Sequence, residues 1–149
     1  MKRTLVALFL LWFALPLRAQ SQETRVAKIQ ALYDTLLVFQ IEYPRTITAI
    51  AIMETGWLEC SKCAFKYNNL FGFRGNGKYM RFDSQEACIA YLKVWQQKNF
   101  VPWKEKHPKG TYHQFLVAIK YAENMPYYLR NITNLERWVS KNIQQKSEE

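Results

Sequence analysis

Apolar residues at helical spacing are the feature that most constrains how this chain folds. Between residues 23 and 41 they recur every three or four positions, which places them on one face of an α-helix. They are Val26, Ile29, Leu32, Leu36 and Leu37. The pattern returns after Thr46, which can cap a second helix to about Trp57, and again in three later segments. Helices with such stripes must pack on one another, so we predict a mainly α fold.

Capping patterns and a proline indicate where the later helices begin. Asp83 and Glu86 form a capping box that opens a helix to about residue 97, before prolines at 102 and 108. Thr111 and Gln114 form a second box, which opens a helix to about residue 121, and Pro126 can open the last helix. The side chains expected to face inward are Ala87, Tyr91, Leu92 and Trp95 in the first of these helices and Leu129, Ile132, Leu135, Trp138 and Val139 in the last.

One short hairpin interrupts the helices. Asn76-Gly77 is a strong signal for a two-residue turn. Folding about it brings four apolar residues to one face, as the pairs Phe73–Met80 and Phe71–Phe82. Arg74 and Tyr79 then lie on the other face, and this agreement between turn and alternation supports the hairpin.

The N-terminus has the layout of a secretory signal peptide. Lys2 and Arg3 precede an apolar run from residue 5 to 15, and Ala19 supplies a small residue at the expected cleavage point. A membrane anchor is the alternative, but the run is short for a bilayer span. We predict a leader at residues 1–19 and a single domain at residues 20–149 with a polar tail from about residue 144. The expected location is periplasmic or secreted, without stable membrane insertion after cleavage.

The net charge constrains the partner. The chain carries +9, which falls to +6 when three basic residues leave with the leader (9 − 3 = 6). An exported basic protein rarely meets nucleic acid, so an anionic polymer of the cell envelope is the better expectation. A positive surface that serves only solubility is the alternative. We expect a monomer and no nucleic-acid partner.

The cysteines and histidines do not form a convincing metal site. Cys60, Cys63 and Cys88 cannot all pair within one chain, and the sequence does not decide which two would be oxidised after export. His107 and His113 are the only histidines, too few to complete a zinc site of the usual spacing. We predict no metal and no cofactor.

Glu54 is the candidate for chemistry. It lies seven residues after Ile47, on the same helical stripe as Ile50 and Ala51, which places its carboxylate on the core-facing side. Partial burial raises the pKa of a carboxyl group, and a general acid needs a raised pKa near neutral pH. The alternative is that the last turn frays and Glu54 reaches water or a lysine.

Ordered motifs then reveal a family resemblance. Residues 54–57 read Glu-Thr-Gly-Trp, and residues 69–72 read Asn-Leu-Phe-Gly. A hairpin, a helix opened by a turn containing Ser84, and a Tyr121-Ala122 segment with Tyr127 follow in order. This arrangement resembles the glucosaminidase domains of glycoside hydrolase family 73, which include flagellar-rod peptidoglycan hydrolases and autolysins. The resemblance covers about residues 27 to 133, and its motifs are specific in combination.

The resemblance implies a lysozyme-like helical domain that cuts peptidoglycan glycan strands at the β-1,4 bond after GlcNAc. Glu54 matches the catalytic acid, and Tyr121 and Tyr127 match tyrosines that line the active site. Trp57, Asn69 and Phe71 match positions that shape the cleft floor. For these three a structural role is the alternative, because aromatic residues at helical spacing usually belong to the core and Asn69 can hold a loop through backbone hydrogen bonds.

The second catalytic group is missing from its expected place. Several family members carry a second carboxylate in the hairpin region, whereas Arg74–Arg81 contains no Asp or Glu. Asp83 and Glu86 follow, but both are expected to serve the helix cap. Attack by the acetamido group of the substrate is one alternative. A muramidase or lytic transglycosylase of the same fold, and a non-catalytic glycan-binding relative, are the other readings.

Overall fold

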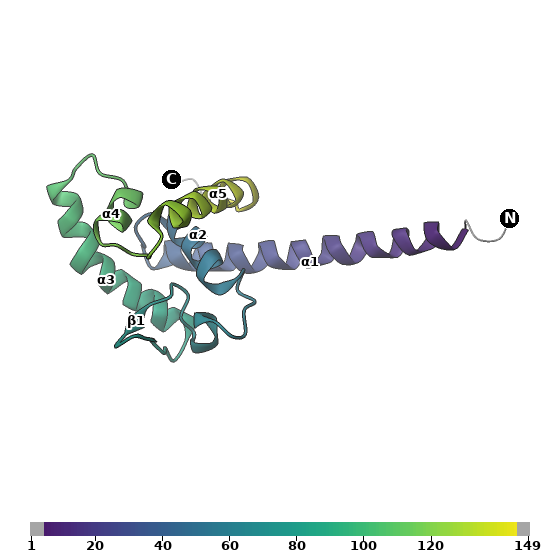
Figure 1. The fold of residues 1–149 in the computed structure, drawn as a ribbon, viewed down its shortest axis with the longest axis horizontal. Helices are drawn as coiled ribbons and strands as arrows, with labels where there is room; N and C mark the ends of the chain where they lie inside the picture. Colours follow the sequence, from purple (N-terminus) through teal and green to yellow (C-terminus); the bar gives the residue numbers. More distant parts are fainter. Residues whose placement is uncertain (1–4, 146–149) are drawn as a thin grey trace.

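The computed structural model describes residues 5–145, with side chains from residue 21 onward. In this part of the chain five α-helices, one 3-10 helix (η1) and one two-stranded antiparallel sheet confirm the mainly α prediction (Figure 1). The elements are α1 Leu5–Val38, α2 Pro44–Thr55, η1 Ala64–Tyr67, β1 Arg74–Gly75, β2 Lys78–Tyr79, α3 Gln85–Lys106, α4 Tyr112–Ala118 and α5 Met125–Asn142. Lys2 and Arg3 of the predicted leader and the last four residues of the polar tail lie outside the described residues.

Helix α1 differs from its predicted bounds at both ends. It begins at Leu5 instead of about residue 23, and its N-terminal half extends away from the other elements (Figure 1). It ends at Val38 instead of residue 41, because Gln40 takes a left-handed conformation (φ 51°) that turns the chain. Ile41 still belongs to the core, and its N–H donates to the Leu36 carbonyl. None of the described helices combines the length and apolar content of a membrane span.

Helix α2 is the central element. It packs against both α1 and α5, and apolar side chains bury it from several directions. The predicted N-cap at Thr46 is wrong. The helix begins at Pro44, preceded by Tyr43 in a left-handed conformation (φ 55°). Proline is favoured at the first helical position because its missing N–H would have had no partner there. The buried Thr46 hydroxyl instead donates to the Glu136 carboxylate on α5, at 2.5 Å.

Helix α3 is longer than predicted and starts from a different cap. Ser84, not Asp83, is the N-cap, and its hydroxyl accepts the Ala87 N–H at 3.1 Å. Pro102 does not end the helix, which continues to Lys106. A proline costs a helix one backbone hydrogen bond. Aromatic packing around this turn offsets that loss, since Phe100 and Trp103 contact aromatic side chains of α4.

The buried face of α3 is rotated from the predicted one. The buried residues are Cys88, Ile89, Leu92, Gln96 and Phe100. Of the predicted set only Leu92 is fully buried, and Tyr91 remains 38% exposed. Gln96 accounts for much of this shift, because its amide exchanges two hydrogen bonds with the backbone of Glu42 and also donates to the Tyr112 hydroxyl. A polar residue was not expected to face the core, but here every polar atom of its amide is satisfied.

The last two helices begin where the sequence predicts. The capping box at Thr111 and Gln114 is confirmed, although α4 ends at Ala118 instead of residue 121. Asn124 caps α5, and Pro126 lies in its first turn as predicted. The predicted apolar stripe of α5 is confirmed, since Ile132 and Val139 are buried and the other three members pack partly against the core.

The hairpin forms about Asn76-Gly77 with the predicted register, pairing Arg74 with Tyr79. The Met80 N–H donates to the Phe73 carbonyl at 2.9 Å, which confirms the next pair. The pairing of Phe71 with Phe82 is wrong, because the Phe82 N–H donates to the Tyr67 carbonyl.

The three cysteines fall into two environments. Cys88 is buried in the main core, accepts the Leu70 N–H at 3.4 Å, and has its pKa raised to about 12 by burial. Cys60 and Cys63 lie together in the segment after α2, where the thiol of Cys63 contacts the Cys60 carbonyl at 3.5 Å. All three are free thiols here.

A partly buried ion pair links α4 to α5 and predicts a pH-dependent stability. His113 Nε2 lies 3.2 Å from Glu136, and this hydrogen bond raises the pKa of the imidazole. The stabilisation is therefore complete below the ordinary pKa of 6.5 and is lost as the pH rises through the raised pKa of the folded state. We expect His113→Gln to lower the free energy of unfolding more at pH of about 6 than at pH of about 9 in urea titrations. His107→Gln is the control, because the His107 ring contacts the Trp103 carbonyl and no carboxylate of the described residues. An equal loss for His113→Gln at both pH values would contradict this assignment.

Candidate active site

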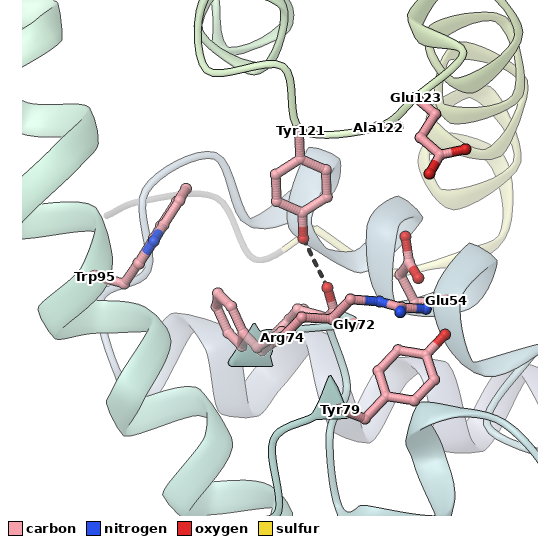
Figure 2. A pocket seen from close by; sticks show the side chains of 10 residues that line it. Glu54, Gly72, Arg74, Tyr79, Trp95, Tyr121, Ala122 and Glu123 are labelled. Carbon is pink, nitrogen blue, oxygen red and sulfur yellow. Dashed lines mark hydrogen bonds between the residues drawn. The ribbon is translucent and has the colours of Figure 1, made fainter. Parts of the chain in front are cut away.

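A cleft of 630 Å³ opens at the end of α2, and Glu54 lies in its wall. The side chains and backbone around it come from α2, the segment after η1, the hairpin, α3 and the α4–α5 loop (Figure 2). The lining residues are Glu54, Phe71, Gly72, Phe73, Arg74, Tyr79, Trp95, Tyr121, Ala122 and Glu123. Within the described residues no group of His, Cys, Asp and Glu is placed to hold a metal ion.

Glu54 is half-buried because α2 places it on the same stripe as core residues. Ile47, Ile50 and Ala51 on that stripe are at most 2% exposed. The helix ends one residue later at Thr55, and Gly56 closes it in a left-handed conformation (φ 54°), so the last turn does not fray. Burial raises the pKa of the Glu54 carboxyl, while a hydrogen bond from Tyr128 and the charge of Arg74 act in the opposite direction. The net direction is upward, as a general acid requires.

Gly72 lets the chain approach this carboxyl closely. A Cβ atom at this position would lie 2.6 Å from Glu54 Oε2, closer than carbon and oxygen can approach. The backbone of Gly72 is also left-handed (φ 70°), which favours glycine. Glycine is therefore required at this position of the Asn-Leu-Phe-Gly motif, because any side chain would collide with Glu54.

Asn69 does not line the cleft but holds the backbone of the Asn-Leu-Phe-Gly motif through hydrogen bonds. Its side chain is fully buried, with 0% exposure. Its Oδ1 accepts the Phe73 N–H at 3.0 Å, and its Nδ2 donates to the carbonyls of Phe73 (2.8 Å) and Met80 (3.0 Å). These three bonds connect the motif to the hairpin and position Phe71 and Gly72 beside Glu54.

The two aromatic residues predicted for the cleft floor, Phe71 and Trp57, lie in different places. Phe71 lines the cleft although only 2% of it is exposed. Trp57 lies outside the cleft lining, where it packs edge-on against Trp138 of α5 with ring centroids 4.7 Å apart. The Arg25 guanidinium covers its ring at 5.2 Å. Trp57 thus connects the end of α2 to the second apolar cluster, which contains Ile52 and Val139.

Tyr121 enters the cleft from the α4–α5 loop. Its hydroxyl donates to the Phe71 carbonyl at 2.7 Å, which Figure 2 marks with a dashed line. Burial and the nearby Glu54 carboxyl raise its pKa well above the ordinary value, so the phenol stays protonated. The bond ties the α4–α5 loop to the segment that carries Gly72.

The tyrosine that contacts Glu54 is Tyr128, one residue after the predicted Tyr127. The Tyr128 hydroxyl donates to Glu54 Oε1 at 3.2 Å. Tyr127 is 53% exposed and lies outside the cleft lining. The sequence offers two adjacent tyrosines here, and helix α5 places the second of them against Glu54.

Seven of the ten lining residues were not predicted as site residues, among them Arg74, Tyr79, Trp95 and Glu123. Arg74 and Tyr79 face each other across the hairpin, with the guanidinium 4.3 Å from the ring centroid, and both border the cleft. Trp95 projects from α3, and Glu123 from the α4–α5 loop (Figure 2). Spacing alone could not identify them, because tertiary contacts between separate segments bring them together.

Comparison with known proteins gives the family. The sequence model of the glucosaminidase family, described as mannosyl-glycoprotein endo-beta-N-acetylglucosaminidase, matches residues 39–146. This stretch contains α2 to α5 and every residue of the cleft lining. No curated protein and no solved structure matches the chain.

The geometry predicts that Tyr128, and not Tyr127, lowers the pKa of Glu54 through a hydrogen bond that opposes the effect of burial. Tyr128→Phe removes a hydrogen bond to the charged carboxylate that lowers its pKa, so we expect the Glu54 pKa to rise. Titration followed by ¹³C NMR of the side-chain carboxyl measures this, with Glu54→Gln to assign the signal. Tyr127→Phe is the matched control and should leave the titration unchanged. A shift in the control but not in Tyr128→Phe would show that the contact is misassigned.

Proposed function

This chain belongs to the glucosaminidase family, and on that basis we propose that it is an exported endo-β-N-acetylglucosaminidase that hydrolyses peptidoglycan. Glycoside hydrolysis of a glycan follows from the family. The finer proposal is that the protein cuts the β-1,4 bond after GlcNAc in peptidoglycan strands. The basic net charge, +9 for the full chain and +6 without residues 1–19 (9 − 3 = 6), supports an anionic envelope polymer as substrate.

In this proposal Glu54 is the general acid. The carboxylic acid donates its proton to the glycosidic oxygen as the bond to the anomeric carbon breaks, so the sugar leaves as a neutral alcohol. The observation that carries the assignment is a half-buried carboxyl with a raised pKa in the wall of the cleft. A carboxyl in water would be almost fully ionised at neutral pH and unable to act as an acid.

The surrounding residues have supporting roles in this proposal. Tyr128 orients the carboxyl through Oε1, which leaves Oε2 on the side of Gly72. Tyr121 and Phe71 shape the wall against which the sugar lies, and Asn69 and Trp57 hold the elements that carry the cleft. Tyr127 has no such contact to Glu54, so we do not assign it a catalytic role.

Product analysis distinguishes this activity from those of related enzymes. We expect the wild type to release muropeptides whose new reducing end is GlcNAc, as read by mass spectrometry. A MurNAc reducing end would indicate a muramidase, and a 1,6-anhydro end a lytic transglycosylase. Glycan binding without any cleavage would indicate a non-catalytic relative. Each of these three results would contradict the proposed specificity.

Glu54→Gln tests the acid role in the same assay. Glutamine keeps the size and an acceptor for Tyr128 but has no acidic proton, so the rate should fall by about a hundred- to ten-thousand-fold. Since the folded pKa is raised, the charged carboxylate costs stability above that pKa and not below the unfolded value. The variant should therefore melt higher than wild type at neutral pH, with a smaller difference in acid. A less stable variant that still cleaves at a near wild-type rate would overturn the assignment.

Export is the remaining element of the proposal. It rests on the basic, apolar and small-residue pattern of residues 1–19. We expect N-terminal sequencing of the protein from an expressing bacterium to begin at Gln20. Recovery of the intact N-terminus from the periplasmic fraction would contradict processing at this site.

A further inference from the structure

A second carboxylate shares the cleft with Glu54. Glu123 lines the same cavity from the α4–α5 loop, whereas Glu54 reaches it from α2. Figure 2 shows the two side chains projecting from separate elements, with the Glu123 carboxylate on the Glu54 side of the loop that carries Tyr121. The hairpin, which contains no acid between Arg74 and Arg81, contributes a cation and an aromatic ring to the cleft instead.

The backbone on both sides of Glu123 is held in place. Tyr121 is bonded to the Phe71 carbonyl at 2.7 Å, and the Ala122 N–H contacts the Met125 sulfur at 3.3 Å. Asn124 caps α5 by accepting the Tyr127 N–H at 3.1 Å. A loop fixed at these points delivers the Glu123 side chain to one side of the cleft, although the side chain itself is exposed.

The carboxylate of Glu123 is also uncommitted. Among the residues whose side chains are described, it makes no hydrogen bond or ion pair, and the residue is exposed where it lines the cleft. The other acids near the hairpin differ. Glu86 bonds to its own backbone N–H and to Ser84 at the start of α3, which lowers its pKa, and neither Glu86 nor Asp83 lines the cleft.

We propose that Glu123 is the general base that activates the water attacking the anomeric carbon, an inference that rests on the proposed glycosidase function. Glu123 takes one proton from the water as its oxygen bonds to the anomeric carbon. At the same time the bond to the leaving oxygen breaks, and that oxygen receives the proton of Glu54. Both carboxyl groups then return to their starting states by exchange with solvent. Attack by an external water opposite the leaving group inverts the anomeric configuration.

The two carboxyl groups suit these roles because their environments differ. Glu54 is half-buried beside Gly72, and this burial favours its protonated form and outweighs the opposing hydrogen bond from Tyr128. Glu123 stands at the exposed edge of the cleft, where water can reach it. An acid and a base whose surroundings differ in this way are a recurring arrangement in glycosidases.

Glu123→Gln and Glu123→Ala test the proposal on the mature protein with soluble, amidase-treated glycan strands. We expect each variant to melt as wild type, to bind the strands, and to lose about a hundred- to ten-thousand-fold in kcat. Glu105→Gln is the matched control, because it changes an exposed acid of α3 that does not line the cleft. A near wild-type rate for Glu123→Gln would overturn the proposal.

Azide rescue and the product anomer separate a chemical role from a structural one. Azide is an anion that needs no deprotonation, so it should restore cleavage by Glu123→Ala and give an α-glycosyl azide, but should not restore Glu54→Gln. Early ¹H NMR of the wild-type product should show the α anomer first. A β product, or no rescue, would contradict a water-activating base at Glu123.

If the wild type itself cleaves no strand, the proposed function fails; if it cleaves and needs Glu54 but not Glu123, only this inference fails.

Discussion

The burial of the Glu54 carboxyl at the end of α2 is the constraint on which the rest of the site depends. A charge removed from water is costly unless neighbouring groups compensate for it, so the carboxyl group takes up a proton more readily instead. Among the described residues the compensation is only partial, a hydrogen bond from Tyr128 and the charge of Arg74. Because the compensation is incomplete, the pKa of Glu54 stays raised, as a general acid requires.

The elements around Glu54 are linked in sequence-distant pairs. Asn69 ties the glycine motif to the hairpin, Tyr121 ties the α4–α5 loop to the same motif, and Trp57 ties the end of α2 to α5. Each link uses a buried polar group or an aromatic contact and leaves the cleft open. Asn69 and Trp57 thus fix the geometry from outside the lining, and Tyr121 does so from the cleft wall itself.

The sequence predicted most of the local structure because local rules decide it. The Asn76-Gly77 turn, the Thr111 capping box and the apolar stripe of α5 depend on neighbouring residues, and all three are confirmed. The failures occurred where tertiary contacts outweighed those rules. Thr46 does not cap α2, and its hydroxyl donates a hydrogen bond to Glu136 instead. Helix α3 continues beyond Pro102, where aromatic side chains pack around it. At the site, helical periodicity was enough to place Glu54 on the core-facing side of its helix. The contact of Tyr128, in place of its neighbour Tyr127, and the presence of Glu123 in the cleft depend on how the α4–α5 loop and α5 pack.

The pH dependence of kcat/KM on soluble glycan strands tests the central claim most directly, because it reports the protonation state of the catalytic acid in the free enzyme. If the half-buried Glu54 is that acid, the alkaline limb of the profile should lie above the ordinary pKa of 4.5, and Tyr128→Phe should move it to higher pH. A wild-type limb at or below that ordinary value, or one that stays in place when the Tyr128 hydroxyl is removed, would contradict the account.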